Sequence, residues 1–283
     1  MTDANRNLLL RVVTAAVLLP LVLWLIWLGG MPFALLIGAA AALACAEVNM
    51  LPWAPREPGA ARAPGSPYTL SLLLSVLVAF ALPVLAEHPL ELLPVTGLFA
   101  ALAVGALIDA LFFEAEVARA PARVGLAALG ALWPALLLSA LVPLRKLPHG
   151  IGWIVLALSV TWLNDTGGYF AGRFLGRRKL FARISPKKTW EGFAGGLLAS
   201  IGGAVAAKAL FLPELSWHGA AIIGAGAGVL GPLGDLSESM LKRAFGAKDS
   251  GRLLPGHGGM LDRIDALFFN APYVLLCARL FAG

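Results

Sequence analysis

Long apolar stretches separated by short polar segments dominate this chain; residues 63–86, for example, carry no charged side chain. A helix that crosses the hydrocarbon core of a bilayer needs about 20 apolar residues. Cutting the apolar stretches at Pro, Gly and charge clusters leaves nine candidate spans, at residues 9–29, 32–50, 68–86, 92–112, 123–143, 151–172, 192–211, 216–234 and 264–282. The pattern therefore predicts an all-α, polytopic integral membrane protein with about nine transmembrane helices.

The composition supports the bilayer as the solvent of this chain. Hydrophobic residues make up 59% of it and charged residues 13%, whereas a soluble domain carries about 25% charge. A soluble globular protein is therefore excluded.

The net charge of +6 could indicate nucleic-acid binding or orientation in a membrane. The positions of the basic residues distinguish these two explanations. With nine spans and a cytoplasmic N-terminus, 18 of the 22 Lys and Arg residues fall on the cytoplasmic side. Such an excess is typical of cytoplasmic loops. We therefore expect the charge to set topology, and we expect no nucleic-acid partner.

Two of the predicted cytoplasmic loops hold more basic residues than orientation requires: seven lie within 173–188 and five within 242–263. We expect one membrane domain over 1–283, in which the helices of about 1–145 are mainly scaffold. The part from about 150 to 283 carries the candidate catalytic loops.

The first of these loops ends in a predicted helix start. Ser185 followed by Pro186 is typical of an N-cap and first helical position, which places Lys187 and Lys188 in the first helical turn. Cations there oppose the helix dipole, so a bound anion such as phosphate would explain them. Enforcement of orientation, or contact with lipid headgroups, is the alternative.

Acidic residues lie at the predicted membrane boundary beside both loops. Asp235 follows the eighth span and Asp262 precedes the ninth, so the two carboxylates are expected at the same depth on adjacent helices. Hard oxygen ligands with room for water and phosphate suit Mg²⁺. Asp265 lies three residues from Asp262, and Asp165 ends the sixth span. Structural ion pairs with neighbouring Arg and Lys residues are the alternative.

The segment between these acids alternates cations with glycines and can cradle a polyphosphate. Its candidate contacts are Lys242, Arg243, Lys248, Arg252, Gly256, Gly258 and Gly259. His257 either touches phosphate, transfers a proton or is structural.

Three other features have structural interpretations. Gly226, Gly228 and Gly231 fit the spacing of a dinucleotide-binding loop, but they lie inside an apolar span without a preceding strand, so we expect them to permit close helix packing. Glu47 and Asp109 are acids within or near spans, for which we expect buried pairing.

The two loops resemble those of the phosphatidate cytidylyltransferases, also called CDP-diacylglycerol synthases. The motif Ser-x-x-Lys-Arg, followed by Lys-Asp-x-Gly, Leu-Pro-x-His-Gly-Gly and Asp-Arg-x-Asp, runs from Ser239 to Asp265. A second stretch, Asn164 to Gly192, is similar to the Asp-Thr-Gly and Ser-Pro-Lys-Lys-Thr-Trp-Glu-Gly segments of that family. The resemblance covers about the C-terminal 120 residues.

The resemblance implies attack of the phosphate of phosphatidate on the α-phosphorus of CTP, giving CDP-diacylglycerol and pyrophosphate at a bacterial inner membrane. It implies Mg²⁺, with K⁺ beside it as a further option, and a homodimer. Asp235 and Asp262 are the candidate metal ligands. The candidate catalytic residues are Asp235, Asp262, Lys248, Asp249, Asp265 and Asp165. The candidate substrate-binding residues are Ser185, Lys187, Lys188, Ser239, Lys242, Arg243, His257, Gly258, Gly259 and Arg263.

Two other functions stay open on sequence alone. A CTP-dependent polyprenol or phytol kinase would share acidic and basic rim loops but transfer a γ-phosphate. An ion-coupled transporter would place its chemistry near the membrane midplane, whereas the polar motifs here lie at one rim.

Overall fold

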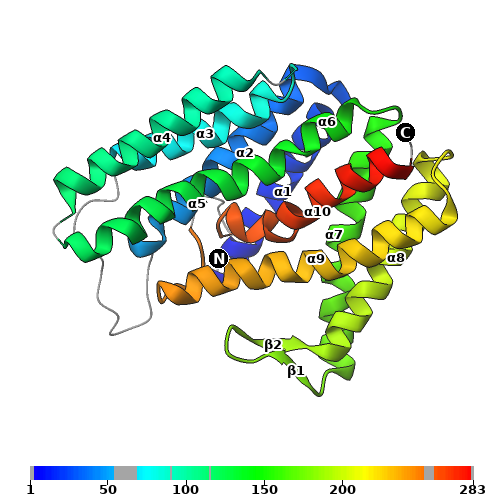
Figure 1. The fold of residues 1–283 in the computed structure, drawn as a ribbon. Coiled ribbons are helices and arrows are strands. Elements are labelled where there is room, and N and C mark those ends of the chain that lie inside the picture. The colour runs from blue at the N-terminus through cyan, green and yellow to red at the C-terminus, as the bar shows by residue number, and fades with distance from the viewer. Residues whose placement is uncertain (1–2, 54–68, 90, 115, 252–257, 282–283) are drawn as a thin grey trace. The chain divides into compact units, whose positions relative to one another are not determined.

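The computed structural model describes the chain except residues 1–2, 54–68, 90, 115, 252–257 and 282–283, and it describes no side chains for residues 3–13 and 15. Each of the nine predicted segments contains a long helix (Figure 1). These helices are α1 (Asp3–Leu28), α2 (Gly30–Met50), α3 (Leu70–Leu85), α4 (Leu92–Phe113), α5 (Ala120–Ser139), α7 (Gly150–Leu175), α8 (Trp190–Phe211), α9 (Trp217–Ala244) and α10 (Leu261–Phe281). Short helical elements are η1 (Leu51–Trp53), η2 (Val117–Arg119) and α6 (Leu141–Lys146). These helices confirm the predicted all-α class.

Six segments are long and apolar enough to cross a membrane: Gly30–Trp53, Leu92–Phe113, Val117–Lys146, Trp190–Phe211, Trp217–Ala244 and Leu261–Phe281. Shorter apolar helices cover Ala16–Leu28 and Leu70–Leu85. The chain is therefore a membrane protein, and the number of nine spans stays a prediction.

The helices form two compact units. Unit 1 consists of Met1–Val142 and Ala244–Arg263, and unit 2 of Pro143–Arg243 and Ile264–Gly283. The segment 244–263, which carries much of the second predicted loop, thus packs with the N-terminal half of the chain. Compactness does not by itself establish independent folding, so the expectation of one membrane domain stays a prediction.

Unit 1 is built around α2, α3 and α5, which pack on one another, while α4 packs on α3 and α5. The buried face of α2 includes the small residues Ala34, Gly38, Ala41 and Ala44, which let neighbouring helices approach closely. Asp109 on α4 forms the expected buried pair, since its Oδ2 lies 3.2 Å from Arg123 Nη2 and accepts a hydrogen bond from the Ser71 hydroxyl at 2.6 Å.

In unit 2, α7 and α8 pack extensively on each other, and α8 and α9 also approach closely at glycines. A Cβ on Gly224 would lie 2.6 Å from Ile201 Cα, and the Ser200 hydroxyl donates to the Gly224 carbonyl at 2.8 Å. Such approach lets polar groups bond across helices in an apolar surrounding. The glycines of α9 therefore serve helix packing, as expected. Asn164 of α7 also bonds to α9, since its amide donates to the Gly228 carbonyl at 3.1 Å.

A β-hairpin, which the sequence reasoning missed, connects α7 and α8. β1 (Lys179–Phe181) pairs antiparallel with β2 (Ser185–Thr189). The prediction that Ser185 caps a helix and that the lysines at 187 and 188 occupy its first turn is wrong. α8 begins at Trp190, and its N-cap is Thr189, whose hydroxyl accepts from Gly192 N at 3.1 Å.

The carboxylate of Glu191 explains why the helix begins there. It accepts from the backbone N–H groups of Arg177 and Arg178 at 3.0–3.3 Å and so fixes the start of the hairpin beside the first turn of α8. The cap at Thr189 and the contacts of Glu191 with the hairpin outweigh the local preference of Ser185 and Pro186 for a helix start.

Candidate active site

Three carboxylates of unit 2 converge at one end of α9 and α10. Asp235, Glu238 and Asp265 each place an oxygen within 4.8 Å of the others, and Glu238 is buried. We call this group the acidic cluster. The sequence reasoning found Asp235 and Asp265 but missed Glu238.

Helix geometry brings these three side chains together. Asp235 and Glu238 are three residues apart on α9, which places them on the same face of the helix. Gly234 lets α10 approach, because a Cβ at this position would lie 2.7 Å from the Asp265 carbonyl oxygen. The Asp265 carboxylate also accepts from Ala266 N at 2.8 Å.

Two lysines supply counter-charge to the acidic cluster. Lys188 Nζ lies 2.5 Å from Asp235 Oδ2, and Lys242 Nζ lies 3.0 Å from Glu238 Oε1. The Ser239 hydroxyl donates to Asp235 Oδ1 at 3.3 Å. Three predicted substrate-binding residues therefore contact the cluster directly. With three acids and two lysines, the group carries a formal charge of −1, which favours a further cation.

A cavity of about 480 Å³ opens beside Asp235. It is lined by parts of α7, α8, α9 and the hairpin: Asn164, Asp165, Gly168, Tyr169, Gly172, Arg173, Leu180, Lys187, Lys188, Thr189, Gly192, Phe193, Pro232 and Asp235. Acidic and basic side chains thus share one cavity with apolar walls. Such a site can hold a phosphate group and a cation next to each other.

A second polar group lies in unit 1, around the start of α10. Asp262 Oδ2 accepts hydrogen bonds from Ser250 N and Gly259 N, both at 3.2 Å, and lies 3.0 Å from the Ser250 hydroxyl, whose single proton it shares with Glu47. The carboxylate of Glu47 on α2 accepts from the Ser250 hydroxyl, Met260 N and Leu261 N at 2.8–3.0 Å. Glu47 is buried as expected, but the partners described for it are hydroxyl and backbone donors.

The exposure or backbone conformation of the other predicted site residues is also described. Ser185 is half-buried in β2, while Arg243, Lys248, Asp249 and Arg263 are exposed. Gly258 has a φ of 82°, which favours glycine, and Gly259 is buried. His257, Arg252 and Gly256 lie outside the described residues. Asp262 belongs to unit 1 and Asp235 to unit 2, so their pairing stays a prediction.

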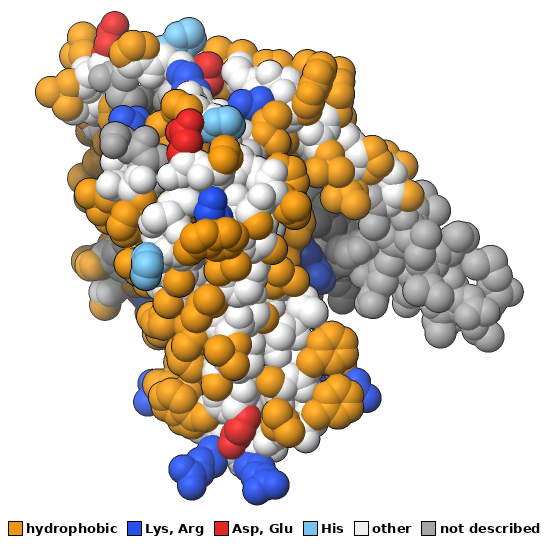
Figure 2. Space-filling model, turned by 90° about the vertical axis from the view of Figure 1, so that its right-hand side faces the viewer, with side chains coloured by type: hydrophobic (Ala, Val, Ile, Leu, Met, Phe, Trp, Pro, Cys, Tyr) orange, Lys and Arg blue, Asp and Glu red, His pale blue; other side chains and the backbone are white. Residues whose placement is uncertain are grey.

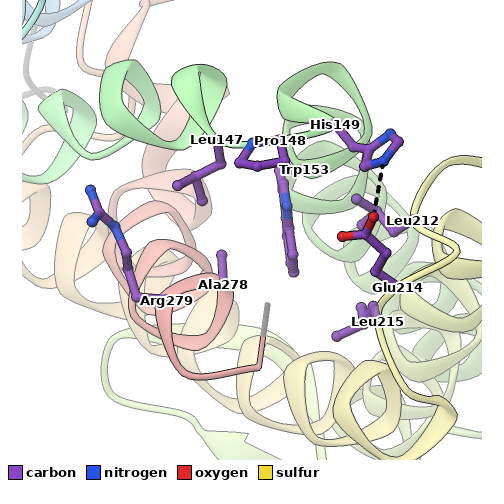
Figure 3. Close-up of a pocket in the computed structure, with 9 residues that line it drawn as sticks. All are labelled: Leu147, Pro148, His149, Trp153, Leu212, Glu214, Leu215, Ala278 and Arg279. Atoms are coloured by element: carbon purple, nitrogen blue, oxygen red, sulfur yellow. Dashed lines mark ion pairs between the residues drawn. The ribbon is translucent and has the colours of Figure 1, made fainter. Parts of the chain in front are cut away.

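A smaller cavity of about 200 Å³ lies at the other end of unit 2, where α7 begins (Figure 3). Its walls are mainly apolar, and Trp153 faces into it. At one side, His149 Nε2 lies 3.7 Å from Glu214 Oε1. His149 and Asp165 are 16 residues apart, or about 24 Å along a helix. This cavity is therefore separate from the acidic cluster.

Comparison with known proteins identifies the class. The sequence model of the cytidylyltransferase family matches residues 9–281, nearly the whole chain. The chain therefore belongs to the cytidylyltransferase family.

Individual relatives of this chain within the family share a more specific name. The phosphatidate cytidylyltransferase of Brucella suis biovar 1 (strain 1330) is 35% identical over 98% of this chain and 95% of its own length. Proteins of the same name match shorter regions: that of Bacillus subtilis (strain 168) is 39% identical over 56% of this chain and 60% of its own, and that of Staphylococcus haemolyticus (strain JCSC1435) is 47% identical over 44% and 47%.

Proposed function

We infer that this membrane protein is a phosphatidate cytidylyltransferase, which makes CDP-diacylglycerol and pyrophosphate from CTP and phosphatidate. The match to a protein of that name over 98% of the chain carries the inference. The cavity that joins lysines to the acidic cluster supports it, because transfer between phosphates requires mainly positioning and neutralisation of charge.

We propose that the acidic cluster holds Mg²⁺. Asp235, Glu238 and Asp265 supply three carboxylates within 4.8 Å of one another, and hard oxygen donors of this kind fit that ion. When bound, Mg²⁺ neutralises charge on the phosphates and orients them. Asp262 as a further ligand, and K⁺ beside Mg²⁺, remain parts of this proposal.

The reaction sets the tasks of the side chains around the cavity. A phosphate oxygen of phosphatidate bonds to the α-phosphorus of CTP, and the bond from that phosphorus to the oxygen bridging to the β-phosphate breaks, releasing pyrophosphate. Lys187 and Lys188 line the cavity and are proposed to bind phosphate oxygens. Lys242, held by Glu238 at 3.0 Å, is proposed to assist them. The lysines position the phosphates and stabilise the negative charge on the leaving group.

We propose that the hairpin end of unit 2 faces the cytoplasm at the surface of a bacterial inner membrane, with the N-terminus on the same side. Figure 2 shows Lys and Arg side chains gathered at one end of this unit, below a surface rich in apolar side chains. Phe174, Phe181 and Trp190 are exposed there, at 73%, 49% and 52%. Exposed aromatic side chains beside basic ones are typical of a membrane interface.

Product analysis tests the activity. Purified full-length protein is incubated with labelled CTP, phosphatidate and Mg²⁺. We expect a lipid product that contains cytidine, together with pyrophosphate. In a parallel incubation with a polyprenol, release of CDP with a phosphorylated lipid alcohol would instead establish a CTP-dependent kinase. Counterflow of an ion in reconstituted vesicles, without lipid product, would favour a transporter.

The proposed homodimer is tested separately, by light scattering after size-exclusion chromatography in detergent. We expect a protein mass of two chains. A mass of one chain, across several detergents, would contradict the dimer without affecting the activity.

A further inference from the structure

Glu47 comes from the N-terminal half of the chain, more than 190 residues before the loop motif, yet its carboxylate accepts three hydrogen bonds from the motif. Oε1 accepts from Met260 N at 3.0 Å, and Oε2 accepts from Leu261 N at 2.8 Å and from the Ser250 hydroxyl at 2.9 Å. All of these residues belong to unit 1. Only 3% of Glu47 is exposed.

These contacts place a carboxylate at the start of α10. The first N–H groups of a helix have no partner within the helix, and a negative charge is favoured there by the helix dipole. Glu47 therefore fixes both the position and the direction of the first turn of α10. That turn includes Asp262, the next residue after Leu261.

Ser250 connects Glu47 to Asp262 directly. Its hydroxyl lies 2.9 Å from Glu47 Oε2 and 3.0 Å from Asp262 Oδ2, and its backbone N–H donates to the same Asp262 oxygen at 3.2 Å. A shift of Glu47 would therefore move Ser250 and change the orientation of the Asp262 carboxylate.

Two glycines make room for this carboxylate. A Cβ on Gly251 would lie 2.7 Å from Glu47 Oε1, and a Cβ on Gly259 would lie 2.5 Å from Glu47 Oε2 and collide with the Ser250 hydroxyl. The backbone at Gly251 and at Gly259 thus approaches Glu47 more closely than any other residue type at these two positions would allow.

We propose that Glu47 is a positioning residue for cytidylyl transfer: it holds Ser250, Met260 and Leu261 in place, and through them it fixes the orientation of the Asp262 carboxylate. This inference rests on the proposed function, in which Asp262 belongs to the active site. A residue of α2, in the half of the chain expected to be mainly scaffold, then controls the catalytic loop.

Replacement of Glu47 by Gln tests this role, because Gln keeps the size of the side chain but offers one acceptor oxygen and turns the other position into a donor. Either Met260 N–H or Leu261 N–H then loses its acceptor, and in the second case the Ser250 hydroxyl keeps only Asp262 as an acceptor. The matched control is Asp109→Asn, which changes another buried carboxylate of unit 1 that contacts Ser71 and Arg123.

Full-length proteins are assayed with CTP, phosphatidate and a series of Mg²⁺ concentrations, and hydrogen–deuterium exchange is measured without substrates. For Glu47→Gln we expect kcat to fall about 10- to 100-fold, as for residues that orient metal ligands, together with a higher half-saturating Mg²⁺ concentration. We also expect faster exchange at the amides of residues 259–261. In Asp109→Asn, the kinetics and the exchange of this loop should stay as in wild type.

The inference is overturned if Glu47→Gln keeps kcat and its Mg²⁺ requirement within twofold of wild type. It is also overturned if the two variants lose activity alike while the Mg²⁺ requirement stays unchanged, which indicates loss of folded protein only. If Glu47→Gln does not fold, Ser250→Ala takes its place, since it removes the bridging hydroxyl and keeps both backbone hydrogen bonds to Glu47; wild-type kinetics in Ser250→Ala then overturn the inference.

Asp262→Asn in the same assay separates this inference from the proposed function. If Asp262→Asn is inactive while Glu47→Gln behaves as wild type, only the positioning role fails. If Asp262→Asn is fully active, the assignment of this loop to the active site fails.

Discussion

Lys188 and Asp235 form an ion pair of 2.5 Å that joins the hairpin strand β2 to the helix α9. The pair places a cation of the hairpin beside three carboxylates, at the wall of the larger cavity. The hairpin is therefore part of the candidate site, and its lysines are the first side chains to test.

Lys188→Ala is expected to lower kcat/KM by about 100-fold or more, because loss of one preorganised charge that stabilises a transition state has effects of this size. Lys187→Ala, which removes a cavity-lining cation outside this ion pair, should have a smaller effect. The exposed Lys179 of β1 provides the control, and its replacement by Ala should leave kcat/KM near wild type. Equal kinetics in all three variants would contradict a role for the pair.

Asp265→Asn and Glu238→Gln are expected to raise the Mg²⁺ concentration needed for half-maximal activity and to weaken Mg²⁺ binding measured by titration calorimetry. Each substitution removes a charged oxygen ligand and keeps the size of the side chain. Glu214→Gln, at the far end of unit 2, should bind Mg²⁺ as wild type does. Unchanged Mg²⁺ binding in both cluster variants would exclude this group as the metal site.

Removal of divalent ions is expected to abolish activity reversibly. Excess chelator should stop formation of CDP-lipid, and added Mg²⁺ should restore it. Ca²⁺ should restore less, because it prefers more ligands at longer distances than the octahedral Mg²⁺. Full activity in excess chelator, with metal content checked by mass spectrometry, would refute the metal requirement.

Thr189→Ala is expected to destabilise the protein by about 1 kcal/mol, because it removes the hydroxyl that caps α8. The midpoint of thermal unfolding in detergent should fall by about 2–4 °C, and Thr189→Ser should restore it. Thr96→Ala serves as the control, since the Thr96 hydroxyl is exposed and donates only to carbonyls of its own helix. A drop of equal size in Thr96→Ala would argue against a special role for the cap.

Gly224→Ala is expected to destabilise unit 2 by about 1–3 kcal/mol, since the new methyl group would lie 2.6 Å from Ile201 Cα and overpack the contact between α8 and α9. Gly202→Ala meets no atom within 4 Å and should stabilise α8 by up to about 1 kcal/mol. Chemical denaturation in detergent measures both. A stabilising effect of Gly224→Ala would show that the two helices are less closely packed.

The long helices were predictable because membrane helices need continuous apolar stretches, and these are visible in any window of the sequence. The hairpin was not, because Ser185 and Pro186 give a strong local signal for a helix start. The competing signals are the cap at Thr189 and the bonds of Glu191 to the backbone at Arg177 and Arg178, and these depend on contacts that form only when the chain folds back.

The candidate site was predictable in part for a similar reason. Asp235 and Asp265 attract notice as acids at the membrane rim, whereas Glu238 resembled an ordinary residue of a polar helix end. Its spacing of three from Asp235 was the signal that could have found it. The contact of Glu47 with Ser250 joins residues 203 positions apart, and a single sequence carries no local pattern that indicates such a contact.

The packing of segment 244–263 with the N-terminal half has a consequence for genetics. Loss-of-function alleles selected for defective phospholipid synthesis should map not only to the loop motif but also to the second helix, around Glu47. For the same reason, a fragment that begins near residue 150 should remain inactive alone and regain function only when residues 1–145 are co-expressed as a separate chain.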